Sequence, residues 1–201
     1  MRGLLIATVI CANITFAFAQ SNEVNGDDST FTVETIVSGA VMATQYDVAP
    51  TAQSVDDRFV GSAFIGRLLW RPNHLLAIGL QTGYVTFSTE DLQAQSIPGA
   101  SELRVSLTAI PIQLAISMNP GSFDLGVGLG GYLLQSIWRI DDDQRVNSSA
   151  IEFGVNSWIG YEFDVFDRLS VGPELSLHVM SNRGIASLAV GVRIRYDVIR
   201  Y

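Results

Sequence analysis

Charged side chains recur in this sequence at alternate positions within apolar segments. The members that could form one internal network are Glu34, Arg67, Glu162, Glu174, His178, Arg193 and Arg195. Rings of charged side chains can line a gate or a narrow conduction path, whereas charges that pair with one another close the space between them. We expect Glu174 and Arg193, on adjacent predicted strands, to pair directly. We favour a paired plug over a path, because the strand pattern described below predicts a barrel that is only wide enough for side chains to fill.

His178 is the candidate for catalysis. Ser176 and Ser181 lie near it in the sequence, but the other histidine, His74, falls in a turn predicted at the opposite end of the molecule. Catalysis needs a base within hydrogen-bond reach of a nucleophile and a group that orients the base. The chain beyond its N-terminal segment has no Gly-x-Ser-x-Gly motif, and we expect no enzymatic activity.

Metal and nucleic-acid binding are disfavoured by spacing and charge. Asp141, Asp142, Asp143 and Asn147 offer the oxygen ligands that calcium prefers, but they lack the Asp-x-Asp-x-Asp-Gly pattern of a dedicated loop. A solvated acidic loop is the favoured interpretation, and we expect no metal or cofactor. The chain has 12 basic residues, all arginine, against 20 acidic ones. We expect no nucleic-acid partner, because such affinity depends on cationic contacts to phosphate.

The elements that must position these residues are strands. Apolar residues alternate with small or polar ones in eight segments, at about 31–42, 59–70, 75–87, 103–118, 123–138, 151–163, 169–180 and 185–198. The connections alternate between long loops, at 45–57, 88–102 and 141–149, and short turns, at 71–74, 119–122 and 164–167; the last long-class loop, 181–184, is abbreviated. This rhythm predicts an all-β fold, an eight-stranded antiparallel up-and-down transmembrane β-barrel.

The two faces of each predicted strand differ in composition. One set is apolar; the other is small, glycine-rich and occasionally charged, as in Gly126, Gly128 and Gly130 against Leu125 and Val127. We place the apolar set in lipid and the small or charged set inside. The alternative is a soluble calycin-like barrel with the apolar face inside. Its outer face would need many solvated charges, which this sequence lacks.

Aromatic residues gather toward the strand ends. The candidates for the interfacial girdles of a membrane barrel are Trp70, Tyr84, Phe87, Trp138, Tyr161, Phe163 and Tyr201. The alternative is the general enrichment of aromatic residues in strands. We favour the girdles.

The N-terminal segment has the features of a secretory signal peptide. A basic start, an apolar run from Leu4 to Ala12 and the sequence Ala17-Phe18-Ala19 predict cleavage after residue 19. The alternative, a membrane anchor, is disfavoured because the run is shorter than the ~20 residues of a spanning helix. We expect a signal peptide at 1–19, a periplasmic lead-in at 20–30 and the barrel at 31–201. The only cysteine, Cys11, falls in the signal peptide, so the mature chain has no thiol.

Several motifs resemble a known family. The sequences at 124–132 (DLGVGLGGY), 152–156 (EFGVN), 159–163 (IGYEF) and 109–113 (AIPIQ) are similar to strands of the small outer-membrane β-barrel domain family of Bacteroidota-type bacteria. The resemblance covers nearly the whole mature chain and is specific for architecture only. It implies insertion by the outer-membrane assembly machinery, which reads a C-terminal aromatic, here Tyr201. Tyr201 lies an odd number of residues after Tyr196 and Val198, so a regular strand would point it to the opposite face. Either a bulge intervenes or the last residues leave the sheet.

The sequence therefore predicts a monomeric protein in the outer membrane of a diderm bacterium, in contact with outer-membrane lipid. An even number of strands puts both termini with the short turns, on the periplasmic side, and the long loops outside. We expect a blocked lumen and a structural or surface-interaction role, with an extracellular ligand at the loops left open. The alternatives are a small channel for solutes and an accessory to secretion or outer-membrane assembly.

Overall fold

A computed structural model of the chain describes residues 31–46, 60–72, 75–93, 102–140, 144–180 and 184–200. The predicted signal peptide, the predicted lead-in, His74, the loop residues Asp141–Asp143 and Tyr201 lie outside these ranges. The strands are β1 (Thr32–Tyr46), β2 (Val60–Arg71), β3 (Leu76–Gln93), β4 (Glu102–Met118), β5 (Phe123–Ile140), β6 (Gln144–Tyr161), β7 (Phe163–Phe166), β8 (Leu169–Met180) and β9 (Ile185–Arg200). No helix within the described residues has the length and apolar character needed to cross a membrane.

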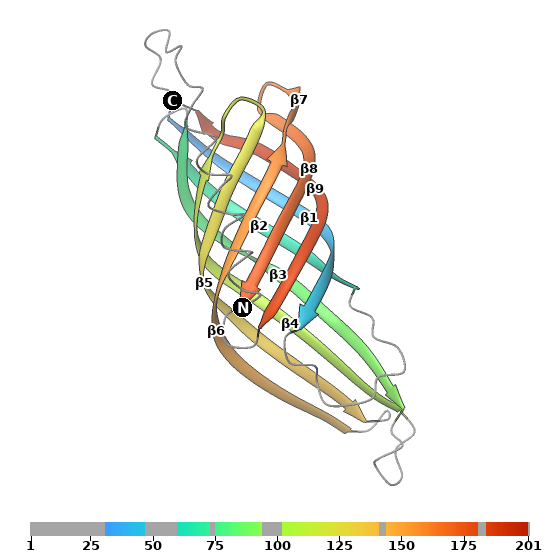
Figure 1. Ribbon diagram of the computed structural model, residues 1–201. Helices are drawn as coiled ribbons and strands as arrows, with labels where there is room; N and C mark the ends of the chain where they lie inside the picture. The colour runs from blue at the N-terminus through green and yellow to red at the C-terminus, as the bar shows by residue number, and fades with distance from the viewer. Residues whose placement is uncertain are drawn as a thin grey trace, which may run out of the picture.

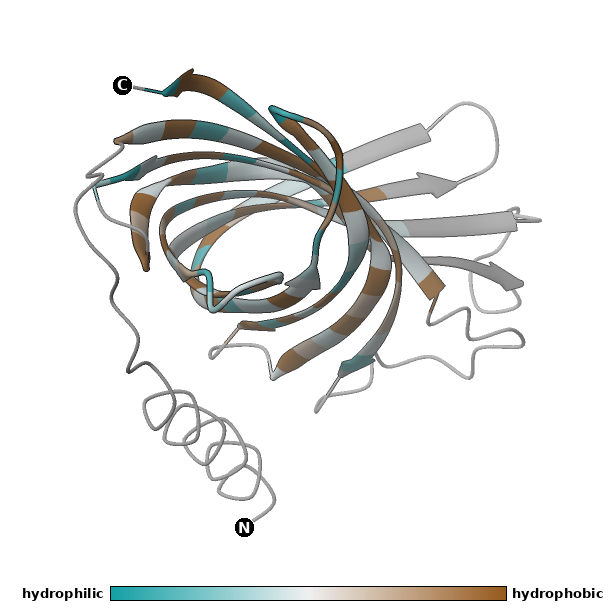
Figure 2. Ribbon diagram, turned by 90° about the horizontal axis from the view of Figure 1, so that it is seen from above, coloured by the Kyte–Doolittle hydropathy of each residue, from teal (hydrophilic) through white to brown (hydrophobic). Residues whose placement is uncertain are grey.

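The strands form one antiparallel sheet that closes on itself. Its order is β6-β5-β4-β3-β2-β1-β9-β8-β7, and pairing of β6 with β8 completes the ring. Sequential strands are neighbours, so the topology is up-and-down, and the view from above shows the closed wall (Figure 2). The structure thus confirms the predicted eight-stranded β-barrel, with β6 and β7 serving as one strand of the wall.

The register fixes the width of the barrel. Paired residues lead once around the wall through Leu169, Tyr196, Thr35, Leu68, Leu80, Leu114, Leu129, Val155 and Val179. The path returns to β8 ten residues beyond its starting point, at Val179 instead of Leu169. Strand number and stagger together set the tilt and diameter, and eight strands leave an interior that side chains can fill.

β7 continues β6 after an interruption opposite Pro173. The pairs Gly160 with Glu174 and Phe163 with Val171 keep the same register, so no residue is inserted between them. Pro173 has no backbone N–H to donate to the ladder. On the opposite side of the strand, the amide of Glu162 donates to the carbonyl of Ser122, 2.8 Å away, next to the start of β5.

The strands extend farther than the sequence predicts. The predicted loop at 88–102 is shortened from both sides, because β3 and β4 remain paired out to Gln93 and Glu102. The predicted loop at 141–149 also shrinks, since β5 and β6 remain paired to Ile140 and Gln144. The predicted turn at 164–167 is wrong in its start, because residues 164–166 belong to β7. Hydrogen bonding between partners extends these hairpins although their sequences are polar.

The longer strands give the barrel a lopsided shape. β3 to β6 have 17 or 18 residues each, whereas β2 and β8 have 12. Figure 1 shows β3, β4, β5 and β6 running on past the ends of β1, β8 and β9 at the lower right. We call this projection the lip; it comprises residues 87–93, 102–108, 135–140 and 144–153.

Side chains alternate between the two faces as the sequence predicts. On β8 every second residue, from Ser170 to Met180, is buried. The outer face carries large exposed apolar residues on all sides, among them Val41, Phe64, Leu80, Ile112, Phe153 and Val190. Figure 2 shows this alternation as bands of contrasting hydropathy along each strand. The apolar face is thus outside, contrary to the soluble calycin-like alternative.

The end of β9 stays in the sheet. Asp197 pairs with Glu34 and Ile199 pairs with Val33, so Val198 is an extra residue at a β-bulge. Of the two explanations for the parity of the C-terminus, a bulge is the one the structure contains.

The contact between Gly172 and β6 gives a stability prediction. A Cβ at Gly172 would lie 1.6 Å from the carbonyl oxygen of Tyr161, so Gly172→Ala must force the strands apart. We expect this variant to lower the free energy of unfolding by about 1–3 kcal/mol, measured by urea titration of the protein refolded in detergent. Gly39→Ala is the matched control, because a Cβ there meets no atom within 4 Å. Equal stability of the two variants would contradict the prediction.

Candidate functional site in the barrel interior

The interior is divided into layers along the barrel axis. A charged layer fills the end with the short turns; its members are Glu34, Arg67, Arg71, Asp124, Glu162, Glu174, Arg193, Arg195 and Asp197. A polar layer follows, made of Gln81, Gln113, Asn156 and His178. A largely apolar plug fills the end toward the lip; it contains Met42, Ile65, Val85, Phe87, Tyr132, Leu134, Met180 and Ile185 with several alanines. The buried Glu152, which stands opposite Tyr132 in register, is a charged side chain at this level.

Arg67 and Glu174 form the central ion pair of the charged layer. Both Nη atoms of Arg67 donate to the carboxylate of Glu174, at 2.7 and 3.0 Å. The Nε of Arg67 donates to Gln81 at 2.7 Å, and the guanidinium lies 4.1 Å from the ring centre of Trp158. Both side chains of the pair are almost fully buried. A bidentate pair with further partners is the geometry that best offsets the desolvation of buried charge.

Arg193 connects a second group of carboxylates. Its Nη1 donates to Asp124 at 2.5 Å and its Nη2 lies 2.9 Å from Glu162. Trp158 also donates to Asp124, at 2.8 Å. The expected pair of Arg193 with Glu174 is only a distant contact, with 3.9 Å between Nε and Oε2. The offset is the reason, since Arg193 pairs in register with Gly172, two residues before Glu174.

The charged layer continues to the mouth at the short turns. Arg71 donates to Glu34 at 2.6 Å and to Asn119 at 3.1 Å. Arg195 donates to Glu162 and is the most exposed member of the layer apart from the rim. At the rim Arg200, nearly half exposed, pairs with Asp197. The charged layer therefore meets solvent at this end, and its pairs run without a break to the centre.

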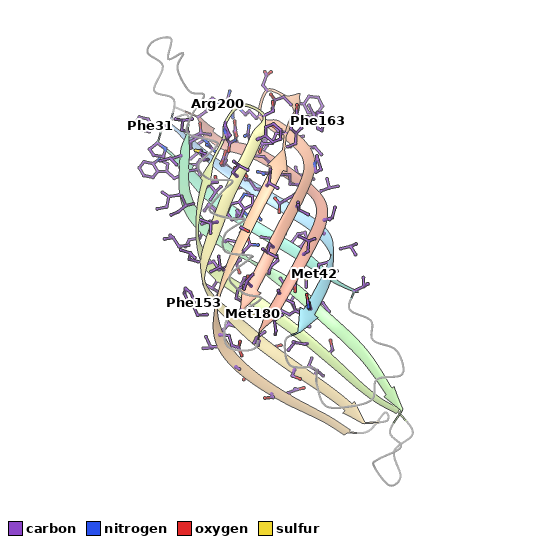
Figure 3. All side chains as sticks on the ribbon, in the orientation of Figure 1. Phe31, Met42, Phe153, Phe163, Met180 and Arg200 are labelled. Carbon is purple, nitrogen blue, oxygen red and sulfur yellow. The ribbon has the colours of Figure 1, made fainter. Side chains whose placement is uncertain are left out.

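The polar layer joins the charges to the apolar plug. Gln81 donates to Gln113 at 2.7 Å and to Asn156 at 3.1 Å. The hydroxyl of Tyr132 is 3.0 Å from Nδ1 of His178, and His178 has no exposed surface. Met180 and Ile185, almost fully buried, close the barrel beyond it. Met42 and Met180 mark this end in Figure 3.

The structure brings together six of the seven residues of the predicted network in the charged layer, and His178 is the exception. It adds Arg71, Asp124 and Asp197 as partners, and the buried Trp158 that contacts two of the charges. The alternation of the strands could have identified these four residues in the sequence, because each lies an even number of positions from other inward-facing residues of its strand. His178 belongs to the polar layer and touches Tyr132 and Asn156, not the arginines.

Most of the predicted interfacial aromatics lie at the outer wall. The prediction for Phe87 is wrong, because this side chain has no exposed surface and packs in the apolar plug inside the barrel. Trp70, Tyr84 and Phe163 are 45%, 50% and 58% exposed. Tyr161 packs edge-to-face against Phe123 and Phe163, with ring centres 5.0 and 4.8 Å away. Trp138 belongs to the part of β5 in the lip, where the structure describes the backbone only. In Figure 3, Phe153 and Phe163 mark opposite ends of the wall.

The arrangement can fix charges but offers little chemistry. His178 is sealed between the charged layer and the plug, and the hydroxyl within its reach belongs to Tyr132. No group of three or more metal-ligating side chains occurs within the described ranges. What the geometry supports directly is a closed interior of paired charges.

Comparison with known proteins addresses the fold. No protein-family model and no curated protein matches this chain. Among solved structures, Ail, the attachment invasion locus protein of Yersinia pestis, in complex with the heparin analogue sucrose octasulfate, matches with a TM-score of 0.51 at 8% identity. The match covers 84% of this chain and all of that one.

A second solved structure has the same architecture. A major outer membrane protein from Thermus thermophilus matches with a TM-score of 0.50 at 9% identity, over 81% of this chain and 99% of that one. The fold is thus that of the small outer-membrane β-barrels. At these identities the likeness concerns the fold and not the activity.

The Arg67–Glu174 pair gives a stability prediction. Glu174→Ala leaves Arg67 buried without its anion, and we expect a loss of about 3–5 kcal/mol in the free energy of unfolding. The double variant Arg67→Met with Glu174→Leu removes both charges, and we expect it to regain most of that loss. Urea titration in detergent measures both.

The rim pair is the control for this measurement. Arg200→Ala removes a side chain that is nearly half exposed and leaves the buried Asp197 with a second arginine, Arg195, at 3.7 Å, so we expect a loss below about 1 kcal/mol. A Glu174→Ala variant as stable as Arg200→Ala would show that the buried pair is not a stabilising constraint.

Proposed function

We propose that this protein is an integral outer-membrane β-barrel with a closed lumen, and that its role is structural or surface-interacting through the lip. The observation that carries the proposal is the inversion of its surfaces. Large apolar side chains cover the outside, and nine charged side chains fill one end of the inside. A protein in water would bury the first set and expose the second. In a bilayer, a closed barrel with an apolar outer face satisfies its backbone internally.

The size of the apolar surface supports a membrane location. On β9 the exposed apolar residues are Leu188, Val190, Val192, Ile194, Tyr196 and Val198. From Leu188 to Val198 is ten residues, roughly 33 Å of strand at about 3.3 Å per residue. Tilted by the ~40° usual in such barrels, this run spans about 25 Å along the axis. That is the height of the apolar band in outer-membrane barrels.

The lip supports a surface-interaction role. On the lip side of the pair Ser62–Thr86, β3 has no partner among the described residues of β2. Likewise, the part of β6 that precedes Gly154 has no partner among the described residues of β8. Asn147, Ser148 and Ser149 at the β6 side are exposed and polar. A projecting sheet of this kind offers backbone groups to an extended segment of a partner. In our proposal the lip faces outside the cell and both termini face the periplasm.

The remaining features of the proposal follow from the sequence. We infer a monomer that is secreted through a signal peptide at 1–19 and inserted by the outer-membrane assembly machinery, with Tyr201 as its signal. The affiliation with the Bacteroidota-type family rests on the motifs in β4, β5 and β6. We propose that the protein is not an enzyme and uses no cofactor, as the sealed surroundings of His178 suggest.

Membrane location has a direct test. We expect the protein to sediment with the outer-membrane fraction and to migrate faster on a gel before heating than after, because a closed barrel stays compact in detergent until heated. Gel electrophoresis of fractionated cells measures both properties. Recovery as an unshifted, soluble periplasmic protein would refute the proposal.

The closed lumen predicts electrical silence. In planar bilayers we expect no steady single-channel conductance from the wild-type protein, because the charged layer and the apolar plug fill the cross-section. A steady conductance that disappears in Glu174→Ala or Arg193→Ala would favour the solute channel. Co-purification with secretion components through the short turns would favour an accessory of secretion.

A further inference from the structure

An apolar groove opens on the outer wall of the barrel, in the half nearer the short turns. Its volume is about 200 Å³. It is lined by Phe123, Ile159, Tyr161, Pro173, Leu175 and Val190, together with residues 160 and 174. The Glu174 carboxylate is not part of the groove, because it points into the lumen toward Arg67. The groove crosses β5, β6, β8 and β9.

The groove exists because Pro173 is a compact residue among larger ones. Pro173 faces outward on β8, and Leu175, two residues farther on, is 41% exposed. Ile159 stands opposite Leu175 in register, so these two residues form the side of the groove that lies toward the lip. The volume equals about seven water-sized groups at ~30 Å³ each. It fits a segment of one alkyl chain, and it is too small for a folded protein element.

The β7–β8 hairpin continues this surface from the groove toward the short turns. Phe163 packs on Tyr161, with ring centres 4.8 Å apart, and leads to Val165 and Phe166, which are 52% and 70% exposed. Asp164 accepts a hydrogen bond from Ser170 at 2.7 Å, and Asp164 and Asp167 are both exposed on the hairpin. Exposed apolar side chains therefore lie both at the groove and on the hairpin, with these two carboxylates beside them.

A cation stands at the tip of this hairpin. Arg168 is exposed, and its guanidinium forms no ion pair within the described part of the chain, whereas the other described arginines of this end, Arg71, Arg195 and Arg200, are paired. The backbone of Arg168 is fixed, because its carbonyl accepts from the amide of Asp197 at 3.0 Å. The side chain is therefore free to bind an anion from a defined position.

We propose that this groove and hairpin bind one phospholipid, with an alkyl chain in the groove and the phosphate at Arg168. The inference rests on the proposed membrane location and deepens it by naming a specific lipid contact. Arg168 lies five residues before Pro173, roughly 16 Å along the strand. The hydrocarbon of one leaflet is about 15 Å deep. The groove thus lies within the leaflet whose headgroups the hairpin reaches.

Native mass spectrometry of the full-length barrel tests the proposal. The protein is refolded in detergent, mixed with phosphatidylglycerol and studied at collision energies that strip loosely bound lipid. We expect one retained phospholipid per wild-type chain. Leu175→Trp fills the groove and should abolish the retained lipid. Arg168→Gln removes the cation and should weaken retention about fivefold, as expected for one arginine at a membrane surface.

Ile112→Trp is the matched control. Ile112 is 55% exposed on β4 and does not line the groove, so this variant adds the same ring to the same kind of wall and should retain lipid as the wild type does. Val190→Trp closes the groove from β9 and replaces Leu175→Trp where that variant fails to refold. Equal retention by all variants, or none by the wild type, would overturn the lipid site.

Vesicle flotation of the same samples separates the two proposals. A barrel that shifts on heating and floats with vesicles but retains no phospholipid leaves the membrane location intact and refutes the lipid site. A protein that neither shifts nor floats refutes the membrane location itself.

Discussion

A sheet of eight strands that closes on itself encloses no more space than its own inward side chains occupy, and the rest of this structure depends on that constraint. Away from the lip, closure gives each strand of the wall a hydrogen-bonded neighbour on both sides, which is the condition for crossing a bilayer without a helix. The stagger of ten residues around the ring then fixes which inward side chains meet at each level. Glycines such as Gly172 permit the closest strand contacts.

The charges follow from this narrowness. In a wide pore an arginine could stay hydrated. Here Arg67 and Arg193 are both almost fully buried, so each needs a carboxylate partner inside the barrel. Arg67 reaches across the interior from β2 to Glu174 on β8, although β1 and β9 lie between these strands in the sheet. Such a pair joins strands that share no hydrogen bonds. It therefore ties opposite walls together, a role that a pair between neighbours could not fill.

The two ends of the molecule are chemically different. The end with the short turns carries the charged layer, the aromatic cluster around Tyr161 and the β7–β8 hairpin. The other end carries the apolar plug and the lip. The plug lies between the ends, so the lip and the mouth at the short turns are separate surfaces. Under the proposed membrane location, the lip is reached from one side only.

The order of residues along the chain was enough to establish the class of fold and the facing of nearly every described side chain. Both depend on a period of two, which is local: once a strand forms, Glu174 and His178 must share a face, and Leu175 must take the other. The bulge near Val198 also left a local trace in the parity of Tyr201. The same alternation identified all seven residues of the predicted network as inward-facing, because this property depends only on their positions within the strands.

The partners and the strand ends were set instead by contacts between distant segments. Glu174 pairs with Arg67 instead of Arg193, because the stagger of the closed ring sets Arg193 two residues out of step on the neighbouring strand. Polar segments such as 88–93 became strand because a partner strand was present to hold them. The groove at Pro173 needed four strands to meet. Each of these outcomes depends on residues far apart in the chain, and a pattern that repeats every second residue carries no information about them.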